Sequence, residues 1–418
     1  MTPSGRGKRA LLITANYGCG NLSGGSQRTN LVFRALRSEY DVDVLIVGST
    51  IGDMHRAAFG DANHIHEANY AEPGEAGPWR IIRPLNSKLI DKIATAVSPR
   101  RLMYNADQKM SQSLRDMDFS RYDFVVGRYL RPTARTGILE RADAPPVLID
   151  IDDRDDLVLL SQLGKYKTNP VMSAVFRNHI KQISAIMAEK LPKTAHLWLS
   201  NEDDREGFDH SSISVLPNIP YYAPPAGARG APDSEKPIVL FVGSGGYQAN
   251  QGGVARFLKQ CWPGIAAAMP QVRLRVVGAG WENLRQSFGA LSGLEIVGRI
   301  DDLAGEYARA TIAVSPVYEG GGTKIKVLEA LSFGVPIVAA SHSARGFSER
   351  LKQEGIVSAE SDEEMIKSCT AMLNDPALCA QYAERGRTIV NEIYSFEGFT
   401  RRVVLDCEAV LKRGGKTD

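Results

Sequence analysis

Short, continuous runs of apolar residues alternate with longer amphipathic segments along most of the chain. Apolar runs of this length are typical of strands buried on both faces, and strands separated by helices form parallel sheets. The sequence therefore predicts an α/β fold built from doubly wound parallel sheets. The predicted strands are Ala10–Ala15, Val42–Val47, Phe124–Gly127, Val147–Ile151, His196–Ser200, Ile238–Val242, Leu274–Val277, Leu294–Val297, Ile312–Ser315 and Pro336–Ala339. The predicted helices are Ser26–Glu39, Val171–Leu191, Val254–Trp262, Leu303–Arg309 and Lys324–Phe333.

This alternation is interrupted by Tyr221–Pro237, a stretch rich in Pro, Gly and Ala that is typical of a linker. We therefore predict an N-terminal domain over residues 1–220, a linker over 221–237, a C-terminal domain over 238–395 and a final helix over 396–418. Two Rossmann-like domains joined in this way would face each other across a cleft. Ligands of open parallel sheets bind at the carboxyl ends of the strands, which would line that cleft.

Composition excludes several classes of protein. Of the 418 residues, 43% are hydrophobic and 23% are charged, which excludes a disordered or collagen-like chain. The 50 Lys and Arg residues nearly balance the 48 Asp and Glu residues, and a net charge of +2 argues against nucleic acid as a partner. The five cysteines form no CxxC pair and the histidines show no ligand spacing, so no metal site is expected. No apolar run reaches the ~20 residues of a membrane span, which predicts a cytoplasmic protein.

One segment, from Arg80 to Arg141, is markedly basic, with thirteen Lys or Arg residues against six Asp or Glu residues. It includes the run Arg128, Arg131 and Arg135. One interpretation is a solvated helical face. The other is a basic surface that meets a phosphate-bearing acceptor or the anionic lipids of an inner membrane face.

The most informative motif is the run of three glycines, Gly320, Gly321 and Gly322. It lies between a strand that ends at Ser315 and a helix predicted to begin near Thr323. Glycines let the backbone approach a ligand without a side-chain clash. The amides of the first helical turn and the helix dipole favour an anion at this position. The motif therefore predicts a phosphate or diphosphate site.

Charged residues follow the three glycines closely. Lys324 and Lys326 add positive charge, and Glu329 lies three residues after Lys326. A lysine for phosphate and a carboxylate one turn deeper suit a nucleotide, because the carboxylate can accept two hydrogen bonds from a ribose diol. The alternative is a solvent-exposed Lys–Glu pair after a glycine-rich turn, and the spacing alone leaves both interpretations open.

The order of several motifs resembles that of the family-4 retaining glycosyltransferases (glycosyl transferases group 1), which have the two-domain GT-B fold. Gly320–Val338 resembles the donor-site signature of that family. The other similar stretches are Leu199–Phe208, Ser214–Pro220, Phe241–Leu258, Leu274–Gly280 and Leu294–Pro316. Together they cover nearly the whole chain.

The resemblance implies that the C-terminal domain binds a nucleotide diphosphate sugar, with no cofactor required. The loop Gly320–Thr323, with Lys324 or Lys326, would hold the diphosphate. Glu329 would bind the ribose hydroxyls, and the backbone around Arg299 would meet the nucleobase.

It also implies where the second substrate binds. The acceptor, a sugar, glycolipid or oligosaccharide, would dock on the N-terminal domain. The last helix, from about Phe396 to Lys412, would cross back onto that domain. The implied reaction is retaining transfer of the sugar to a hydroxyl group, in polysaccharide or glycolipid biosynthesis.

Two features depart from the family pattern. Many members carry two glutamates separated by seven residues, and here Gly321 takes the place of the first, so Glu319 is the substitute candidate for a catalytic role. Many members also carry Arg and Lys on the first loop of the C-terminal domain. Here that loop reads GSGGYQAN and offers Ser244 and Asn250 as donor contacts, without a basic residue.

A second glycine-rich loop follows the strand Ala10–Ala15. Ser23 occupies the place of the third glycine of GxGxxG, so a nicotinamide site is not supported. The pair Gly24 and Gly25 resembles a glycine pair of the family's N-terminal domain, which lies near the donor phosphate and lets the acceptor approach. The alternative is a tight turn with a helix N-cap at Ser26.

The strand Val147–Ile151 ends in an acidic cluster, DIDDRDD. Asp152 and Asp153 occupy the place of a His–Asp pair whose histidine, in many family members, touches the donor sugar. The resemblance implies that Asp152 orients a sugar hydroxyl or the acceptor nucleophile. The alternative is a cluster that caps the next helix. A metal-binding DxD pair, as in the GT-A fold, is not expected because the glycine motif already supplies the donor site.

Two other functions stay open. A protein that binds nucleotide sugars without catalysis would explain the missing first glutamate and the missing basic pair. A sugar-nucleotide epimerase on the same fold is the third candidate.

Overall fold

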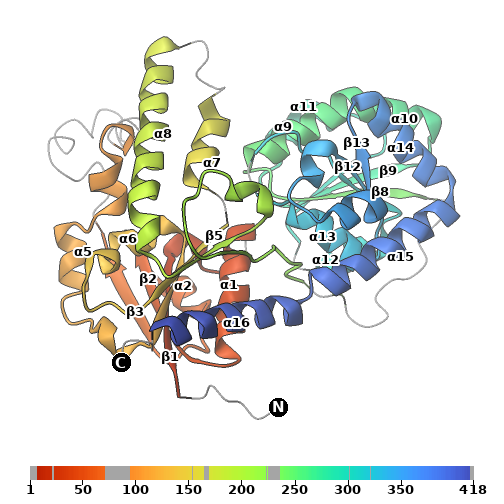
Figure 1. Cartoon of the computed structure of the whole chain (residues 1–418). Helices are drawn as coiled ribbons and strands as arrows, with labels where there is room; N and C mark the ends of the chain where they lie inside the picture. Colours follow the sequence, from red (N-terminus) through yellow and green to blue (C-terminus); the bar gives the residue numbers. More distant parts are fainter. Residues whose placement is uncertain are drawn as a thin grey trace. The chain divides into compact units, whose positions relative to one another are not determined.

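The computed structural model describes residues 7–20, 23–70, 95–152, 154–163, 169–222, 224, 236–300, 302–320 and 322–414. The chain forms two compact units (Figure 1). Unit 1 comprises Met1–Pro217 and Phe399–Asp418, and unit 2 comprises Asn218–Gly398. Most of the predicted linker, residues 223 and 225–235, lies outside the described residues.

Unit 1 contains a parallel sheet of seven strands in the order β3-β2-β1-β4-β5-β6-β7. Its central strands are continuous apolar runs, so both faces of the sheet are buried, as the alternation predicts. The strands are β1 Arg9–Ala15, β2 Asp41–Gly48, β3 Ile65–Asn69, β4 Phe124–Arg128, β5 Val147–Ile151, β6 His196–Leu199 and β7 Ile213–Val215.

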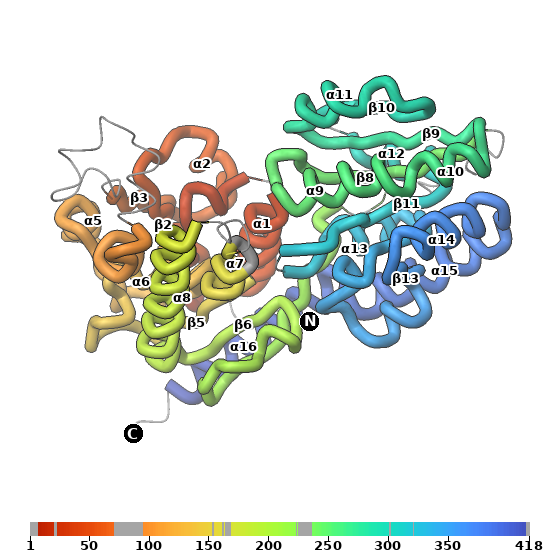
Figure 2. Tube along the Cα trace, turned by 90° about the horizontal axis from the view of Figure 1, so that it is seen from above, coloured from red at the N-terminus to blue at the C-terminus, as the bar shows by residue number. Residues whose placement is uncertain are grey.

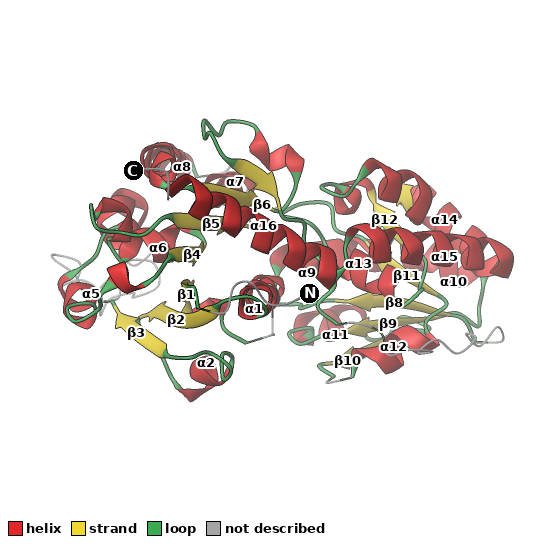
Figure 3. Ribbon diagram, turned by 60° about the horizontal axis from the view of Figure 1, so that its bottom comes forward, coloured by secondary structure: helices red, strands yellow, loops and turns green. Residues whose placement is uncertain are grey.

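Helices cover both faces of this sheet (Figure 3). The helices of unit 1 are α1 Gly24–Arg37, α2 Asp53–Ala57, α5 Gln108–Ser113, α6 Leu130–Arg135, α7 Asp155–Gln162, α8 Pro170–Lys190 and α16 Phe396–Gly414. The carboxyl-terminal half of α8 packs into the core through Ile183, Ile186 and Met187, whereas its first turns extend beyond the sheet beside α7 (Figure 1).

Most of the C-terminal helix α16, from Phe399 onward, belongs to unit 1. Its buried residues Phe399, Val403, Cys407 and Val410 recur at helical spacing and form one apolar face. Asp406 fixes the helix to the sheet, because its carboxylate accepts hydrogen bonds from Trp198 Nε1 at 2.9 Å and Ser214 Oγ at 2.7 Å.

Unit 2 repeats the same architecture with six parallel strands in the order β10-β9-β8-β11-β12-β13 (Figure 2). The strands are β8 Ile238–Val242, β9 Arg273–Val277, β10 Leu294–Gly298, β11 Ile312–Ser315, β12 Ile337–Ala340 and β13 Ile356–Ala359. The helices are α9 Gln248–Arg256, α10 Trp262–Ala268, α11 Glu282–Phe288, α12 Leu303–Arg309, α13 Ile325–Ser332, α14 Asp362–Asn374 and α15 Pro376–Ile393. A separate core, which includes Phe241, Leu258, Trp262 and Trp281, fills this unit.

In both sheets the strand order reverses direction beside the first strand of the unit. The chain runs outward from β1 to β3 and then returns to place β4 on the other side of β1. In unit 2 the chain runs outward from β8 to β10 and then returns to place β11 on the other side of β8. Ligands of doubly wound sheets bind at such switch points, outside the carboxyl ends of the strands. The fold thus directs attention to the loops after β1 and β4, and after β8 and β11.

Candidate functional site

The loops after β8 and β11 carry most of the residues that we predicted to contact the donor. Ser244 lies in the first loop and Asn250 in the first turn of α9. The second loop carries Gly320, Gly322, Thr323 and Lys324, whereas Gly321 lies outside the described residues. The two loops follow neighbouring strands, so the switch point of unit 2 brings the predicted residues to one edge of the sheet.

The glycine turn has a backbone that only glycine adopts easily. Gly320 has a φ of 96° and Gly322 a φ of 64°, both in the left-handed region. A Cβ atom at Gly320 would also stand 2.5 Å from the hydroxyl of Tyr247. The imidazole Nε2 of His342 donates to the carbonyl oxygen of Gly320 at 2.9 Å and so holds the turn in place.

Helix α13 begins at Ile325, slightly later than the predicted start near Thr323. The amide of Val327 already donates to the carbonyl of Lys324 at 2.8 Å, so fewer first-turn amides than predicted are open to a ligand. The hydroxyl of Thr323 accepts a hydrogen bond from Asn218 Nδ2 at 2.7 Å. More of the charge on a bound anion would therefore have to be balanced by the lysine side chains.

Lys326 is held in a defined position between three elements. Its ammonium donates to the side-chain oxygen of Asn250 and lies 4.5 Å from the centre of the Phe241 ring. Asn250 in turn donates to the carbonyl of Ser244 at 2.9 Å, so the first loop, α9 and α13 are joined through one amide side chain. Ser244 itself is exposed, and its hydroxyl accepts the amide of Gly246 at 3.2 Å.

Glu329 is buried, at 6% exposure, and this decides between the two interpretations of the Lys–Glu spacing. The interpretation of Lys326 and Glu329 as a solvent-exposed pair is therefore wrong. Burial raises the pKa of Glu329 to about 7, although a hydrogen bond from Tyr307 and the charge of Lys326 act in the opposite direction. The Tyr307 hydroxyl lies 3.5 Å from Glu329 Oε2.

Lys324 and Lys326 give this edge of the sheet an excess of positive charge. Burial, and then the neighbouring charge of Lys324, lower the pKa of Lys326 to about 7, whereas Glu329 acts to raise it. Lys324 is also buried, and its ammonium donates to the carbonyl of Gly322 at 3.0 Å. A bound anion would supply the opposite charge that would restore full protonation of Lys326. The arrangement is therefore suited to phosphate groups.

Glycines elsewhere let the backbone segments around this edge approach closely. A Cβ atom at Gly253 in α9 would stand 1.9 Å from the carbonyl oxygen of Pro316. At Gly278 it would stand 2.0 Å from the carbonyl oxygen of Gly243, which also accepts a hydrogen bond from Trp281 Nε1 at 3.0 Å. Only glycine permits these approaches, so the loops after β8, β9 and β11 form one packed layer.

The remaining predicted residues of unit 2 are exposed. Arg299 follows β10, the edge strand, and so lies two strands away from β8. Glu319, the substitute for the missing glutamate, lies on the loop just before the glycine turn. Sequence reasoning missed Tyr247, Tyr307 and His342, for which the sequence carries no signal because their partners are distant along the chain.

In unit 1, Gly24 and Gly25 open α1. The alternative N-cap at Ser26 is wrong, because Ser23 is the N-cap and forms a capping box with Ser26. A Cβ atom at Gly25 would stand 2.6 Å from the hydroxyl of Tyr129. Tyr129 follows β4 and has a φ of 68°, a strained conformation for a residue with a side chain. Strain of this kind at a switch point marks Tyr129 as a candidate for function.

The acidic cluster after β5 divides into residues with different surroundings. Asp150 is fully buried and accepts hydrogen bonds from Arg28 at 2.8 Å and from Arg128. Burial pushes the pKa of Asp150 upward, but the two guanidinium groups outweigh this and hold it below its ordinary value. Asp152 is 6% exposed, with its carboxylate 3.7 Å from Arg128 Nη2. Asp153 lies outside the described residues.

The last two acids of the cluster lie at the start of α7. Asp155 and Asp156 occupy the first turn, where the helix dipole favours negative charge. Asp156 Oδ1 accepts the amide of Leu157 at 3.0 Å and Asp155 Oδ2 accepts the hydroxyl of Tyr104 at 2.7 Å. The helix-end interpretation of the cluster thus describes these two residues, but not Asp150.

The arginine run in the basic segment does not form a solvated face. Arg128 and Arg135 are buried, and each pairs with a carboxylate of its own unit, Arg128 with Asp150 and Arg135 with Asp107 at 3.1 Å. Residues 80–94 of the segment lie outside the described residues. The run from Arg128 to Arg135 begins at the last residue of β4, at the carboxyl edge of the unit 1 sheet, whereas Arg121 pairs with Asp43 and Arg141 with Asp143.

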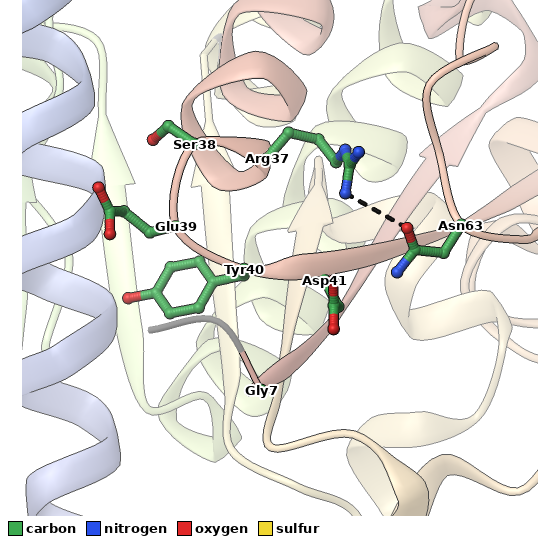
Figure 4. A pocket seen from close by; sticks show the side chains of 7 residues that line it. All are labelled: Gly7, Arg37, Ser38, Glu39, Tyr40, Asp41 and Asn63. Carbon is green, nitrogen blue, oxygen red and sulfur yellow. Dashed lines mark hydrogen bonds between the residues drawn. The ribbon is translucent and has the colours of Figure 1, made fainter. Parts of the chain in front are cut away.

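A hollow of about 500 Å³ lies at the opposite, amino edge of the same sheet (Figure 4). Arg37 and Asn63 form a hydrogen bond of 3.3 Å across part of it. The lining residues are Gly7, Arg37, Ser38, Glu39, Tyr40, Asp41 and Asn63. This edge is remote from the switch point, so the hollow is not a candidate for either substrate.

Within the described ranges, no three His, Cys, Asp and Glu side chains gather as metal ligands would. Among the described helices, none combines the length and the apolar character that crossing a membrane requires.

Part of the chain is similar in sequence to known glycosyltransferases. Residues 236–375 match the family model described as glycosyl transferases group 1. An uncharacterised glycosyltransferase of Haemophilus influenzae is 28% identical over 149 residues, which are 34% of this chain and 41% of that protein. An exopolysaccharide phosphotransferase of Streptomyces coelicolor is 29% identical over 124 residues, 28% of this chain and 13% of that protein. The matches thus span less than half the length of either relative.

Solved structures show the same fold over almost the whole chain. A sucrose-phosphate synthase from Thermosynechococcus elongatus has a TM-score of 0.65 and 15% identity, over 97% of this chain and all of that one. HepE of Anabaena, in complex with UDP and glucose, has a TM-score of 0.62 and 12% identity, over 96% of this chain and all of that one. WaaG, a glycosyltransferase of lipopolysaccharide biosynthesis, has a TM-score of 0.57 and 14% identity, over 95% and 99%.

These likenesses and the two parallel α/β units define a protein of the GT-B fold, as the sequence predicts. The part of the chain that carries the glycine turn, residues 236–375, is similar to the glycosyl transferases group 1 family.

Proposed function

We propose that this protein is a retaining glycosyltransferase, which moves a sugar from a nucleotide diphosphate sugar to a hydroxyl group of an acceptor. The donor binds unit 2 and the acceptor binds unit 1. The setting is the synthesis of a polysaccharide or a glycolipid. This is supported by the likeness to WaaG, which acts in lipopolysaccharide biosynthesis, and to the exopolysaccharide phosphotransferase of Streptomyces.

The observation that carries the proposal is the glycine turn with Lys324, Lys326 and Glu329 at the switch point of a group 1 domain. The leaving diphosphate gains negative charge as the glycosidic bond breaks, and two lysines fixed in a partly buried edge would stabilise that charge. Glu329 would accept the ribose hydroxyls. The HepE complex with UDP and glucose supports a nucleotide sugar as the donor.

On the acceptor side, Asp152 is the residue we assign to catalysis, together with Asp153. The carboxylate of Asp152 is buried beside Arg128, whereas Asp150 is enclosed between two arginines and Asp156 pairs with Arg154 at the start of α7. Asp152 would orient the acceptor hydroxyl or a sugar hydroxyl. Glu319 would approach the donor sugar only if the exposed loop before the glycine turn closed over it. No separate covalent nucleophile is required if the acceptor attacks the face from which the leaving group departs.

A screen of nucleotide sugars, with and without acceptors, tests this proposal. Transfer should appear only when donor and acceptor are both present, and nuclear magnetic resonance should show the anomeric configuration of the donor retained in the product. Asp152→Asn should lose turnover while its melting temperature stays close to that of the wild type. Unchanged turnover in this variant would remove Asp152 from the mechanism.

The two alternatives give different results in the same screen. A catalytically silent binding protein would show calorimetric binding of a nucleotide sugar and no turnover with any acceptor. Gly321 in place of the first family glutamate is the feature that favours it. An epimerase would convert one nucleotide sugar to another without an acceptor.

A further inference from the structure

Three buried nitrogen atoms without a hydrogen-bond partner lie on helices at one edge of unit 1. They are Nε of Arg131, Nε of Arg135 and Nε2 of His179. Arg131 and Arg135 are four residues apart on α6, which follows β4, and His179 lies on α8. Buried polar groups in folded proteins are nearly always paired, so three unpaired nitrogen atoms in one neighbourhood require an explanation.

The charged groups around Arg131 and His179 show that these two side chains lie near each other. The guanidinium of Arg131 lies 3.7 Å from Asp155, beyond hydrogen-bond distance. The pKa of His179 is lowered by burial and then by the charge of Arg131, and Asp155 acts to raise it. Both residues therefore face the same carboxylate. This edge is the carboxyl side of the unit 1 sheet, where ligands of doubly wound folds bind.

The acceptor oxygens near these nitrogen atoms are the carboxylates of Asp155 and Asp107 and the hydroxyl of Tyr104, which lies within hydrogen-bonding reach of Arg131. None of them pairs with the three nitrogen atoms. Asp155 already accepts the hydroxyl of Tyr104, and Asp107 accepts Arg135 Nη2. The Arg135 guanidinium also donates to the carbonyl of Leu102 and lies 3.8 Å from the centre of the Tyr70 ring, so its position is fixed while its Nε stays unpaired. A neutral hydroxyl group would bring a donor as well as an acceptor, whereas an oxyanion brings only acceptors.

We propose that Arg131 and Arg135, with His179, bind an anionic group of the acceptor, a phosphate or a carboxylate. Arginine suits this role because its planar guanidinium presents parallel N–H donors to such groups. The inference rests on the proposed function, since it takes unit 1 as the acceptor side. It adds the substrate class: the acceptor is an acidic sugar or a phosphate-bearing molecule rather than a neutral sugar.

Calorimetric titration tests this in the Lys326→Met variant, so that the phosphate site of unit 2 does not contribute. The probes are glucose 6-phosphate, glucuronate and glucose. We expect saturable binding of at least one anionic probe and none of glucose, and which anion binds tells a phosphate from a carboxylate acceptor. In the same background, Arg131→Gln should weaken that binding by about tenfold or more, and Arg131→Lys by less.

The matched control is Arg141→Gln, because Arg141 is exposed and pairs with the exposed Asp143. It should leave the binding unchanged, and circular dichroism should show that every variant is folded. The proposal is overturned if glucose binds as well as the anions, if neither anion binds at millimolar concentration, or if Arg131→Gln binds them like its parent. A separate titration of the wild type with UDP and GDP reports on unit 2, so failure of the donor site is recognised independently.

Discussion

The ammonium of Lys326 donates a hydrogen bond to the side-chain oxygen of Asn250, and this contact joins the helix after the glycine turn to the helix after β8. The two residues are 76 positions apart, and the sequence alone gave no reason to pair them. The contact supplies a basic group beside the first loop of unit 2, which has no Arg or Lys of its own. We therefore propose that Lys326 replaces the basic pair that many group 1 glycosyltransferases carry on that loop.

Two adjacent glycines of α9 should respond in opposite ways to the same substitution. Gly253→Ala should reduce the free energy of unfolding by about 1 to 3 kcal/mol, because the added carbon would meet the carbonyl of Pro316. Gly252→Ala is the matched control, since Gly252 is exposed and has nothing within 4 Å of its Cβ position. It should increase stability by about 0.5 to 1 kcal/mol, as alanine does within a helix. Equal effects in denaturant titrations would contradict the close approach.

Asp150 should be a structural residue rather than a catalytic one. Asp150→Asn would leave Arg28 and Arg128 buried without their counter-charge, so we expect a loss of about 3 to 5 kcal/mol in the free energy of unfolding. Asp143→Asn, which removes the carboxylate of an exposed pair with Arg141, should leave the free energy of unfolding nearly unchanged. Urea denaturation measures both, and a small loss at Asp150 would show that the two arginines have other compensation.

Glu329→Gln should make the protein more stable but less able to bind nucleotide. The carboxyl group has a pKa of about 7 in the folded protein and an ordinary value of 4.5, so its ionisation costs about 3 kcal/mol of stability above pH 7. Below pH 4.5 the group is protonated in both states and the cost vanishes. The variant should therefore gain stability at pH 8 and none at pH 4, as thermal unfolding at the two pH values would show. An equal effect at both pH values would mean that Glu329 is not buried.

Nucleotide binding should take up protons above pH 7. The free Lys326 ammonium has a pKa of about 7, and a bound diphosphate would raise it, so binding at pH 8 must bring a proton to a lysine that is largely neutral. Affinity should accordingly fall as the pH rises above 7. Calorimetry in buffers of different ionisation enthalpy measures the uptake, which should be absent in Lys326→Met. The account of Lys326 is wrong if both proteins take up the same number of protons.

The fold could be read from the sequence where apolar runs are continuous. The predicted strands Val147–Ile151, Ile238–Val242 and Ile312–Ser315 are confirmed residue by residue. The edge strands β3 and β7 were missed because they are short and only partly buried, which removes the apolar signal.

The first helix of unit 2 shows how tertiary contacts outweigh local preference. We predicted a helix over Val254–Trp262, which begins just after Gly252 and Gly253, and glycine disfavours helix interiors. The helix begins at Gln248, and Gly253 lies within it because Pro316 packs too closely for any larger residue. Contacts between elements distant along the chain decided this boundary.

The candidate site was predictable only in part. The glycine turn and the lysines after it could be recognised from their spacing. The burial of Glu329 could not, because it depends on Tyr307, 22 residues earlier. The pattern of the acidic cluster does not show that Asp150 is enclosed by charge, because its partners Arg28 and Arg128 are distant along the chain.

The most direct measurement of the central claim is the affinity of the protein for UDP and GDP with and without the Lys326 ammonium. Lys326→Met should bind the preferred nucleotide at least about tenfold more weakly, because a charge-assisted contact to the diphosphate is lost. Lys367→Met, which removes an exposed lysine of the same unit, should bind like the wild type. An unchanged dissociation constant in the folded Lys326→Met variant would contradict the assignment of the glycine turn as the diphosphate site.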